Sequence, residues 1–112
     1  MSVKIERYGS HFKEAISYIL LREIQDSNLK FVSITDVDIT NDLGFAKVYF
    51  TILDKNKKDI VLKSLNKAKS FIRMEIAKRV DIRKMPELIF VYDESIEHGE
   101  KIDKILDKLE NN

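Results

Sequence analysis

The residues of this sequence with the clearest potential for chemistry are positively charged and are concentrated in one segment. Residues 55–84 contain eleven Lys and Arg but only three Asp and Glu, which gives this segment a net charge of +8. Residues 1–54 carry −2 and residues 85–112 carry −5, so the whole chain is nearly neutral at +1. Such a basic segment is typical of a protein that binds a polyanion. A solvated helical face would have the same composition, and charge alone does not separate the two interpretations.

Other kinds of chemical site find little support in the residue types and their spacing. The chain contains no Cys, which excludes disulfides, thiolate zinc sites, iron–sulfur clusters and cysteine nucleophiles. His11 and His98 are far apart and have no ligand spacing around them, so no metal site is predicted. No Ser/His/Asp order, phosphate-binding loop or dinucleotide fingerprint occurs. We therefore expect no catalytic residue, no metal and no cofactor.

Length and composition indicate one domain that spans residues 1–112. A chain of 112 residues with 44% hydrophobic and 35% charged residues is typical of a single globular domain. It has no internal repeat and no Pro/Gly/Ser linker. No stretch approaches the roughly 18 apolar residues of a membrane span, and no signal-peptide pattern opens the sequence. These features predict a cytoplasmic protein that does not interact with a membrane.

Hydrophobic periodicity predicts a helix followed by a hairpin in the first half of the chain. Apolar residues at helical spacing mark a helix over residues 10–26, with Ser10 as its N-cap. Residues 31–40 are predicted to form a strand whose alternation changes phase near residues 35–36, which indicates a β-bulge. After a turn, residues 45–53 alternate cleanly and predict a second, antiparallel strand.

The second half is predicted to contain three helices and one more strand. Asp54 is a good N-cap for a helix that ends at a break near Ala68-Lys69-Ser70, where the Ser side chain could begin the next helix. The apolar run of residues 88–92 predicts a strand buried on both faces, and a final helix is expected over about residues 94–110. The resulting order predicts an α+β fold, with a three-stranded sheet and its helices on one face.

Five short motifs occur at consistent spacing along nearly the whole chain. They are Leu20-Leu21-Arg22-Glu23-Ile24-x-Asp26, Asp42-Leu43-x-x-Ala46-Lys47-Val48-Tyr49-x-Thr51-x-Leu53, Phe71-Ile72-Arg73, Pro86-Glu87-Leu88-x-Phe90, and Tyr92-Asp93-x-Ser95-x-x-x-Gly99. Taken in this order, the motifs resemble those of the bacterial ribosome-binding factor A family. The resemblance implies a type II KH-like domain without the Gly-x-x-Gly loop of ordinary KH domains, which agrees with the element order predicted above.

The resemblance also implies a kink between the two middle helices. The family has an Ala-x-Gly tripeptide there, and this chain has Ala68-Lys69-Ser70. Ser costs more than Gly wherever a residue needs a positive φ. The sequence leaves open whether the kink has a different backbone angle in this chain or is capped by the Ser70 hydroxyl.

The basic segment has a more specific interpretation within a helix–kink–helix. Lys and Arg side chains would flank the turn, and the amino end of the following helix would present N–H groups and a positive dipole end to a phosphate. Such contacts position RNA without reading its sequence. The predicted RNA-binding residues are Lys63, Lys67, Lys69, Ser70, Arg73, Lys78, Arg79, Arg83 and Lys84.

The family resemblance implies a role in the maturation of the small ribosomal subunit. Members of the family bind the free, immature 30S subunit and assist the folding and processing of its 16S ribosomal RNA, notably after cold shock, without catalysing a covalent step. We therefore predict a monomeric RNA-binding protein whose partners are this RNA and the immature 30S subunit. The alternative is a protein–protein interaction module that acts through its acidic C-terminal helix and a sheet edge.

Overall fold

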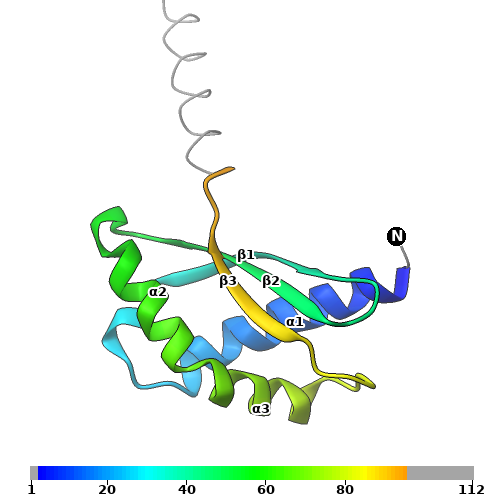
Figure 1. Ribbon diagram of the computed structural model, residues 1–112. Coiled ribbons are helices and arrows are strands. Elements are labelled where there is room, and N and C mark those ends of the chain that lie inside the picture. Colours follow the sequence, from blue (N-terminus) through cyan, green and yellow to red (C-terminus); the bar gives the residue numbers. More distant parts are fainter. Residues whose placement is uncertain (1–2, 96–112) are drawn as a thin grey trace, which may run out of the picture.

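A three-stranded sheet with α-helices packed against one of its faces forms the described part of the protein (Figure 1). The computed structural model describes residues 3–95. Its element order confirms the predicted α+β fold, and the final helix expected over residues 94–110 lies outside the described residues from residue 96 onward. The elements are α1 (Val3–Arg22), β1 (Val32–Ile39), β2 (Phe45–Ile52), α2 (Lys58–Lys67), α3 (Lys69–Arg79) and β3 (Glu87–Tyr92), with 3-10 helices η1 (Ser27–Leu29) and η2 (Lys55–Lys57).

The strand order in the sheet is β1-β2-β3, so β2 is the central strand. β1 and β2 form an antiparallel hairpin whose register changes between Ile34 and Asp36, which confirms the predicted bulge. β3 lies parallel to β2, with Leu88 opposite Ala46. A parallel pair needs a crossover connection, and α2 and α3 supply it (Figure 1).

The hydrophobic core lies between the helices and the inner face of the sheet. α1 contributes Phe12, Ile16 and Ile19, and the central strand contributes Val48 and Phe50, all of them fully buried. The remaining elements add Leu65, Ile72, Ile76, Leu88 and Phe90 to the same cluster. Full burial of a side chain of this size contributes about 1.5 to 3 kcal/mol, so this layer holds α1, α3 and the sheet together.

α1 starts and ends earlier along the chain than its hydrophobic pattern predicts. The predicted start at Ser10 is wrong, because the helix begins at Val3 and Ser10 lies exposed within it. The apolar row continues toward the amino end through Ile5 and Tyr8, which pack against the core and make the extra turns of helix favourable. The helix ends at Arg22, four residues before its predicted end.

Gly9 marks a close approach of α1 to the sheet. A β-carbon at Gly9 would lie 2.7 Å from the carbonyl oxygen of Val37 in β1, which is too close for any side chain unless the backbone moves. Because Gly has no β-carbon, α1 can lie directly against β1. Gly9 is therefore part of the packing between helix and sheet.

β3 has one buried face, not two. Leu88 and Phe90 point into the core, whereas Ile89 between them is 36% exposed. The continuous apolar run therefore gave a wrong prediction. The described helices cover only one face of the sheet, so the outward residues of the strands are open to solvent.

Two short 3-10 turns, one before β1 and one before α2, are each capped by an Asp side chain. Asp26 accepts a hydrogen bond from the Asn28 N–H at 3.0 Å, and Asp54 accepts one from the Asn56 N–H at 3.0 Å. Asp54 thus caps η2 rather than α2, which begins only at Lys58. These caps fix the conformations of the two turns beside the amino end of α2.

The outer edge of β1 is occupied at Val37. The Thr40 N–H bonds to the Phe45 carbonyl at 2.9 Å, and the alternation of an antiparallel pair then directs the backbone groups of Val37 away from β2. The Val37 N–H bonds to the Asp36 side chain at 2.9 Å, and the Val37 carbonyl oxygen lies against Gly9. The Val37 N–H is therefore hydrogen-bonded, and α1 packs against its carbonyl group.

Candidate nucleic-acid interface

The two middle helices meet at Ala68, within the tripeptide predicted to hold a kink. α2 ends at Lys67 and α3 begins at Lys69, and Ala68 between them keeps a right-handed conformation with φ −86° and ψ −2°. The Ala68 N–H donates to the Ser64 carbonyl at 3.1 Å, and the Ala68 carbonyl accepts from the Ile72 N–H at 2.9 Å. A single residue thus closes one helix and opens the next.

Ser70 occupies the second position of α3 and lies outside the turn. The break needs no positive φ, since Leu43, at 60°, is the only non-glycine residue among those described that has one. Ser therefore replaces the family's Gly without the cost of a left-handed conformation. The amino end of α3 has no side-chain cap, so the alternative that the Ser70 hydroxyl caps it is wrong.

Three lysines lie at this break. Lys63 and Lys67 belong to α2 and are exposed, whereas Lys69 begins α3 and is half-buried. Within residues 3–95, none of their ammonium groups pairs with a carboxylate. They lie next to the amino end of α3, where the helix dipole is positive and the first N–H groups have no acceptor in their own helix. This combination of charge and backbone donors favours a phosphate group.

The predicted RNA-binding residues do not form one compact patch. α3 contains 11 residues and is therefore about 16 Å long, and the predicted residues fall into groups at its two ends. The group at the break consists of Lys63, Lys67, Lys69 and Ser70, and the group at the last turn and the following loop consists of Lys78, Arg79, Arg83 and Lys84. Arg73 lies between them.

Arg73 makes its contacts within the protein. Its guanidinium donates hydrogen bonds to the carbonyl oxygens of Met85 and Pro86, both at 3.2 Å. The side chain is half-buried. Arg73 therefore joins α3 to the segment that enters β3.

Changing Arg73 to Ala is expected to lower the free energy of unfolding by about 1 to 2 kcal/mol, because two carbonyl groups lose a charged donor. The matched control is Arg83→Ala, since Arg83 is exposed and its loss is expected to change stability by less than about 0.5 kcal/mol. Urea denaturation of both variants measures the difference. Equal stability of the two variants would contradict this structural role of Arg73.

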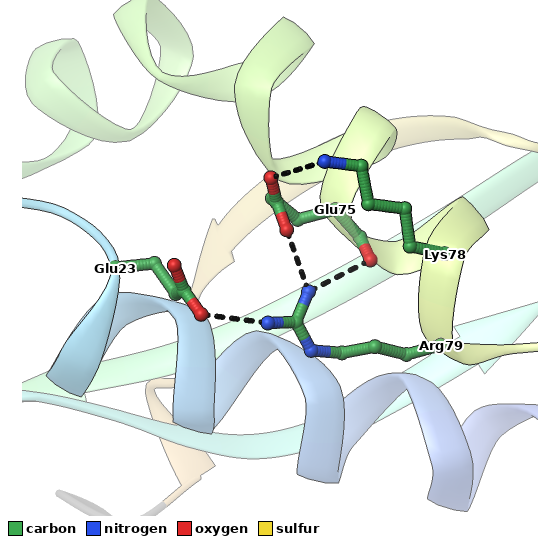
Figure 2. Close-up of polar contacts among 4 residues, drawn as sticks. All are labelled: Glu23, Glu75, Lys78 and Arg79. Carbon is green, nitrogen blue, oxygen red and sulfur yellow. Dashed lines mark hydrogen bonds and ion pairs between the residues drawn. The ribbon is translucent and has the colours of Figure 1, made fainter.

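Arg79 lies between two carboxylates, as Figure 2 shows. Its guanidinium is 2.8 Å from the Glu75 carboxylate and 2.7 Å from the Glu23 carboxylate, and it also donates to the Glu75 carbonyl at 3.0 Å. Lys78 reaches the other carboxylate oxygen of Glu75 at 3.1 Å. The rigid, many-donor guanidinium is suited to bridging several acceptors. The network connects α3 to the end of α1.

The positive charges in this network shift the titration of Glu75. The hydrogen bond from Arg79, and then the one from Lys78, hold the pKa of the Glu75 carboxyl below its ordinary value. Because this pKa is lower in the folded than in the unfolded protein, the network stabilises the fold at pH values above the unfolded pKa. That stabilisation is lost as the pH falls through the folded pKa.

Neither carboxylate of this network was among the residues predicted for the site. Glu75 lies four residues before Arg79, and this spacing on a helix is a recognisable signal for an ion pair. Glu23 lies 56 residues before Arg79, and no sequence pattern indicates their contact. The ion pair between Glu75 and Arg79 was therefore predictable from the sequence, whereas the pair between Glu23 and Arg79 was not.

Lys84 lies near the turn between β1 and β2. Asp42 in this turn accepts hydrogen bonds from the Thr40 hydroxyl at 2.7 Å and the Gly44 N–H at 2.9 Å. These two bonds lower the pKa of Asp42, and the positive charge of Lys84 lowers it further. The Glu87 N–H also donates to the Gly44 carbonyl at 3.0 Å, so the start of β3 adjoins the same turn.

The part of the chain that the structure describes contains neither a candidate metal-binding cluster nor a candidate membrane span. No group of three His, Cys, Asp or Glu residues there could hold a metal ion. None of the helices in this part is long and apolar enough to cross a membrane.

Comparison with known protein sequences points to one family. The family model described as "Ribosome-binding factor A" matches residues 4–106. A protein of this name from Staphylococcus epidermidis is 43% identical over 112 residues, which cover 99% of this chain and 97% of the relative. Another from Macrococcus caseolyticus is 43% identical over 110 residues, which cover 97% of this chain and 96% of the relative.

Solved structures have a similar fold. The crystal structure of ribosome-binding factor A from Thermus thermophilus matches with a TM-score of 0.72 and 20% identity, over 79% of this chain and 94% of that one. A homology model of the Thermus thermophilus protein, fitted into a cryo-electron-microscopy map of its complex with 30S, matches with a TM-score of 0.63 and 21% identity, over 77% of this chain and 91% of that one. At these identities the likeness describes the fold alone.

Proposed function

The chain belongs to the ribosome-binding factor A family, and from this premise we propose that it binds the free, immature 30S ribosomal subunit and assists the maturation and processing of its 16S ribosomal RNA. It binds, holds a conformation of the RNA and is then released, without catalysing a covalent step. It acts in the cytoplasm as a monomer. The observation that carries this proposal is the family match over nearly the whole chain.

The proposed RNA-binding surface runs along α2 and α3 and has its centre at the break between them. Lys63, Lys67 and Lys69 supply cations at this point, and Ser70 adds an exposed hydroxyl in the first turn of α3. Ammonium groups on flexible side chains bind phosphates as point charges. Such a surface would hold RNA by its backbone and leave its sequence unread.

The same surface is proposed to extend toward the turn between β1 and β2. Lys78 has a side chain that is 63% exposed despite its ion pair, and Arg83 and Lys84 are exposed in the loop before β3. Arg73 and Arg79 direct their guanidinium groups into contacts within the protein. Their proposed role is therefore to position α3, so that the lysines around it face the RNA.

Sucrose-gradient sedimentation of a cell lysate tests the proposed function. We expect the protein to migrate with free small subunits and to be absent from translating ribosomes. If the protein stays at the top of a gradient in which free small subunits are present, the proposal is wrong.

The affinity for free 30S subunits is expected to depend strongly on salt. If about five phosphates are contacted, log K should fall with log salt at a slope of about −3.5 to −4.5, because each neutralised phosphate releases counterions. Binding titrations at several salt concentrations measure this slope. A slope close to zero would show that the basic surface is not what holds the subunit.

A further inference from the structure

A half-open pocket lies at the amino end of α2, outside the surface described above. It has a volume of about 240 Å³ and lies between η1, the end of β2 and the start of α2. Its walls are mostly apolar and are formed by Phe31, Ile52, Leu53 and Val61. Its rim includes Lys57 together with polar side chains from the two capped turns.

Two of the apolar residues that line this pocket are strongly exposed. Phe31 is 69% exposed and Leu53 is 84% exposed. An exposed apolar patch next to a hollow is typical of a binding site. In a protein that binds RNA, an exposed aromatic ring beside a pocket is also suited to stacking with an unpaired base.

The rim of the pocket is rigid and keeps some hydrogen-bonding capacity. Its two turns are fixed by the Asp26 and Asp54 caps, each of which accepts a backbone N–H. The Asn28 side chain donates from its amide nitrogen to the Ser64 hydroxyl at 3.5 Å, and its amide oxygen accepts no hydrogen bond from the described residues. That oxygen can accept a hydrogen bond from the edge of a base.

Two lysines lie beside the exposed ring of the pocket. Lys57 lines the pocket and Lys30 directly precedes Phe31, and neither ammonium group pairs with a carboxylate within residues 3–95. Asp54 also lines the pocket and Asp26 lies beside it; each directs a carboxylate oxygen to a backbone N–H, which leaves the two ammonium groups free to contact a phosphate. A nucleotide combines a flat, apolar base with a phosphate and therefore matches both the walls and the rim.

The pocket and the lysines at the α2–α3 break lie at opposite ends of the same helix. α2 has 10 residues and is about 15 Å long. Val61 lines the pocket at its amino end, whereas Lys63 and Lys67 follow toward its carboxyl end. Because these lysines lie on another side of the helix from Val61, the pocket is a contact point separate from the break.

We propose that this pocket binds one unpaired base of single-stranded RNA. The base stacks on Phe31, and Lys30 and Lys57 contact the flanking phosphates. This inference rests on the proposed function and adds to it the class of RNA that the protein selects, which is a single-stranded segment rather than a continuous duplex.

The test uses the full chain and a short single-stranded RNA that carries 2-aminopurine, whose fluorescence is quenched when the base stacks. With the wild-type protein we expect quenching on binding. Changing Phe31 to Ala is expected to weaken binding of this RNA by about 5- to 150-fold, as the loss of one stacked base does. The salt slope should stay the same because no charge is removed. Phe31→Tyr keeps the ring and is expected to keep both the affinity and the quenching.

The matched control is Phe45→Ala. Phe45 is also an exposed aromatic residue, at 50%, but it lies at the start of β2, whereas the pocket lies at the end of that strand. We expect its affinity for the RNA to remain within about twofold of the wild type, since surface changes outside a site have small effects. Thermal midpoints of all three variants confirm that each is folded.

Several results would overturn the inference. The first is a Phe31→Ala variant that binds the RNA as tightly as Phe45→Ala does, and the second is a wild-type protein that does not quench the probe. A third is loss of 30S binding by Phe31→Ala with unchanged binding of the free RNA, which would assign the pocket to a protein partner. The proposed function is tested separately, by sedimentation of the wild-type protein with free 30S subunits. If the wild-type protein sediments with them, the proposed function holds even when the pocket does not bind a base. If it does not, the proposed function is wrong.

Discussion

Changing Lys63, Lys67 and Lys69 together to Glu is expected to abolish association with the free 30S subunit, with a loss of affinity of about 100-fold or more. The three lysines supply a large part of the charge at the α2–α3 break, and the variant replaces three attractive contacts with three repulsive ones. Sedimentation with purified 30S subunits, or a binding titration at fixed salt, measures the loss.

The fold is expected to survive this triple change. None of the three lysines forms an ion pair within the described part of the chain, and two of them are exposed, so the thermal midpoint should stay nearly unchanged. A charge-matched control changes three exposed residues on α1 and β2 to Glu, namely Arg7, Lys13 and Lys47. Equal loss of binding in both variants would mean that net charge, and not the break, determines affinity.

Changing Gly9 to Ala is expected to destabilise the protein, although Ala favours a helix by about 1 kcal/mol over Gly. The new β-carbon would lie 2.7 Å from the Val37 carbonyl oxygen, so α1 or β1 must move. Overpacking of this kind costs about 1 to 3 kcal/mol. Each kcal/mol lost lowers the Tm of a domain of this size by about 4 to 8 °C. Urea and thermal denaturation measure the effect.

Ser17→Ala is the control for this experiment. Ser17 is exposed within the same helix, where the change adds helix propensity and meets no backbone of the sheet. We expect its stability to be equal to or slightly above that of the wild type. If Gly9→Ala is as stable as Ser17→Ala, the close contact between α1 and β1 does not constrain this position.

The sequence predicted those parts of the fold that depend on near neighbours. The hairpin and its bulge could be predicted because the side chains of a strand alternate between two faces, and the change of phase near residues 35–36 appears directly in the order of apolar residues. The position of the helix break could be predicted because two apolar rows fail to join there. The start of α1 could not, because Gly9 is explained by a contact with Val37 in another element.

The candidate site was predicted less completely because basic residues look alike in a sequence whatever they contact. Arg73 bonds to carbonyl groups 12 and 13 residues further along the chain. Arg79 meets a carboxylate that lies 56 residues before it. Only the fold distinguishes these two arginines, which position α3, from the lysines that remain open to a ligand. The pocket beside Phe31 was missed for the same reason, because its walls come from segments that meet only in the folded chain.

The occupied edge of β1 affects how the protein behaves when many copies are present. A free strand edge can pair with the same strand of another molecule and so lead to aggregation. Here the Asp36 side chain accepts the Val37 N–H, α1 packs against the Val37 carbonyl, and the bulge interrupts the regular spacing of the strand. At the other side of the sheet, β3 is in contact with α2. These features leave fewer regular backbone groups on the β1 edge for the same strand of another molecule to pair with.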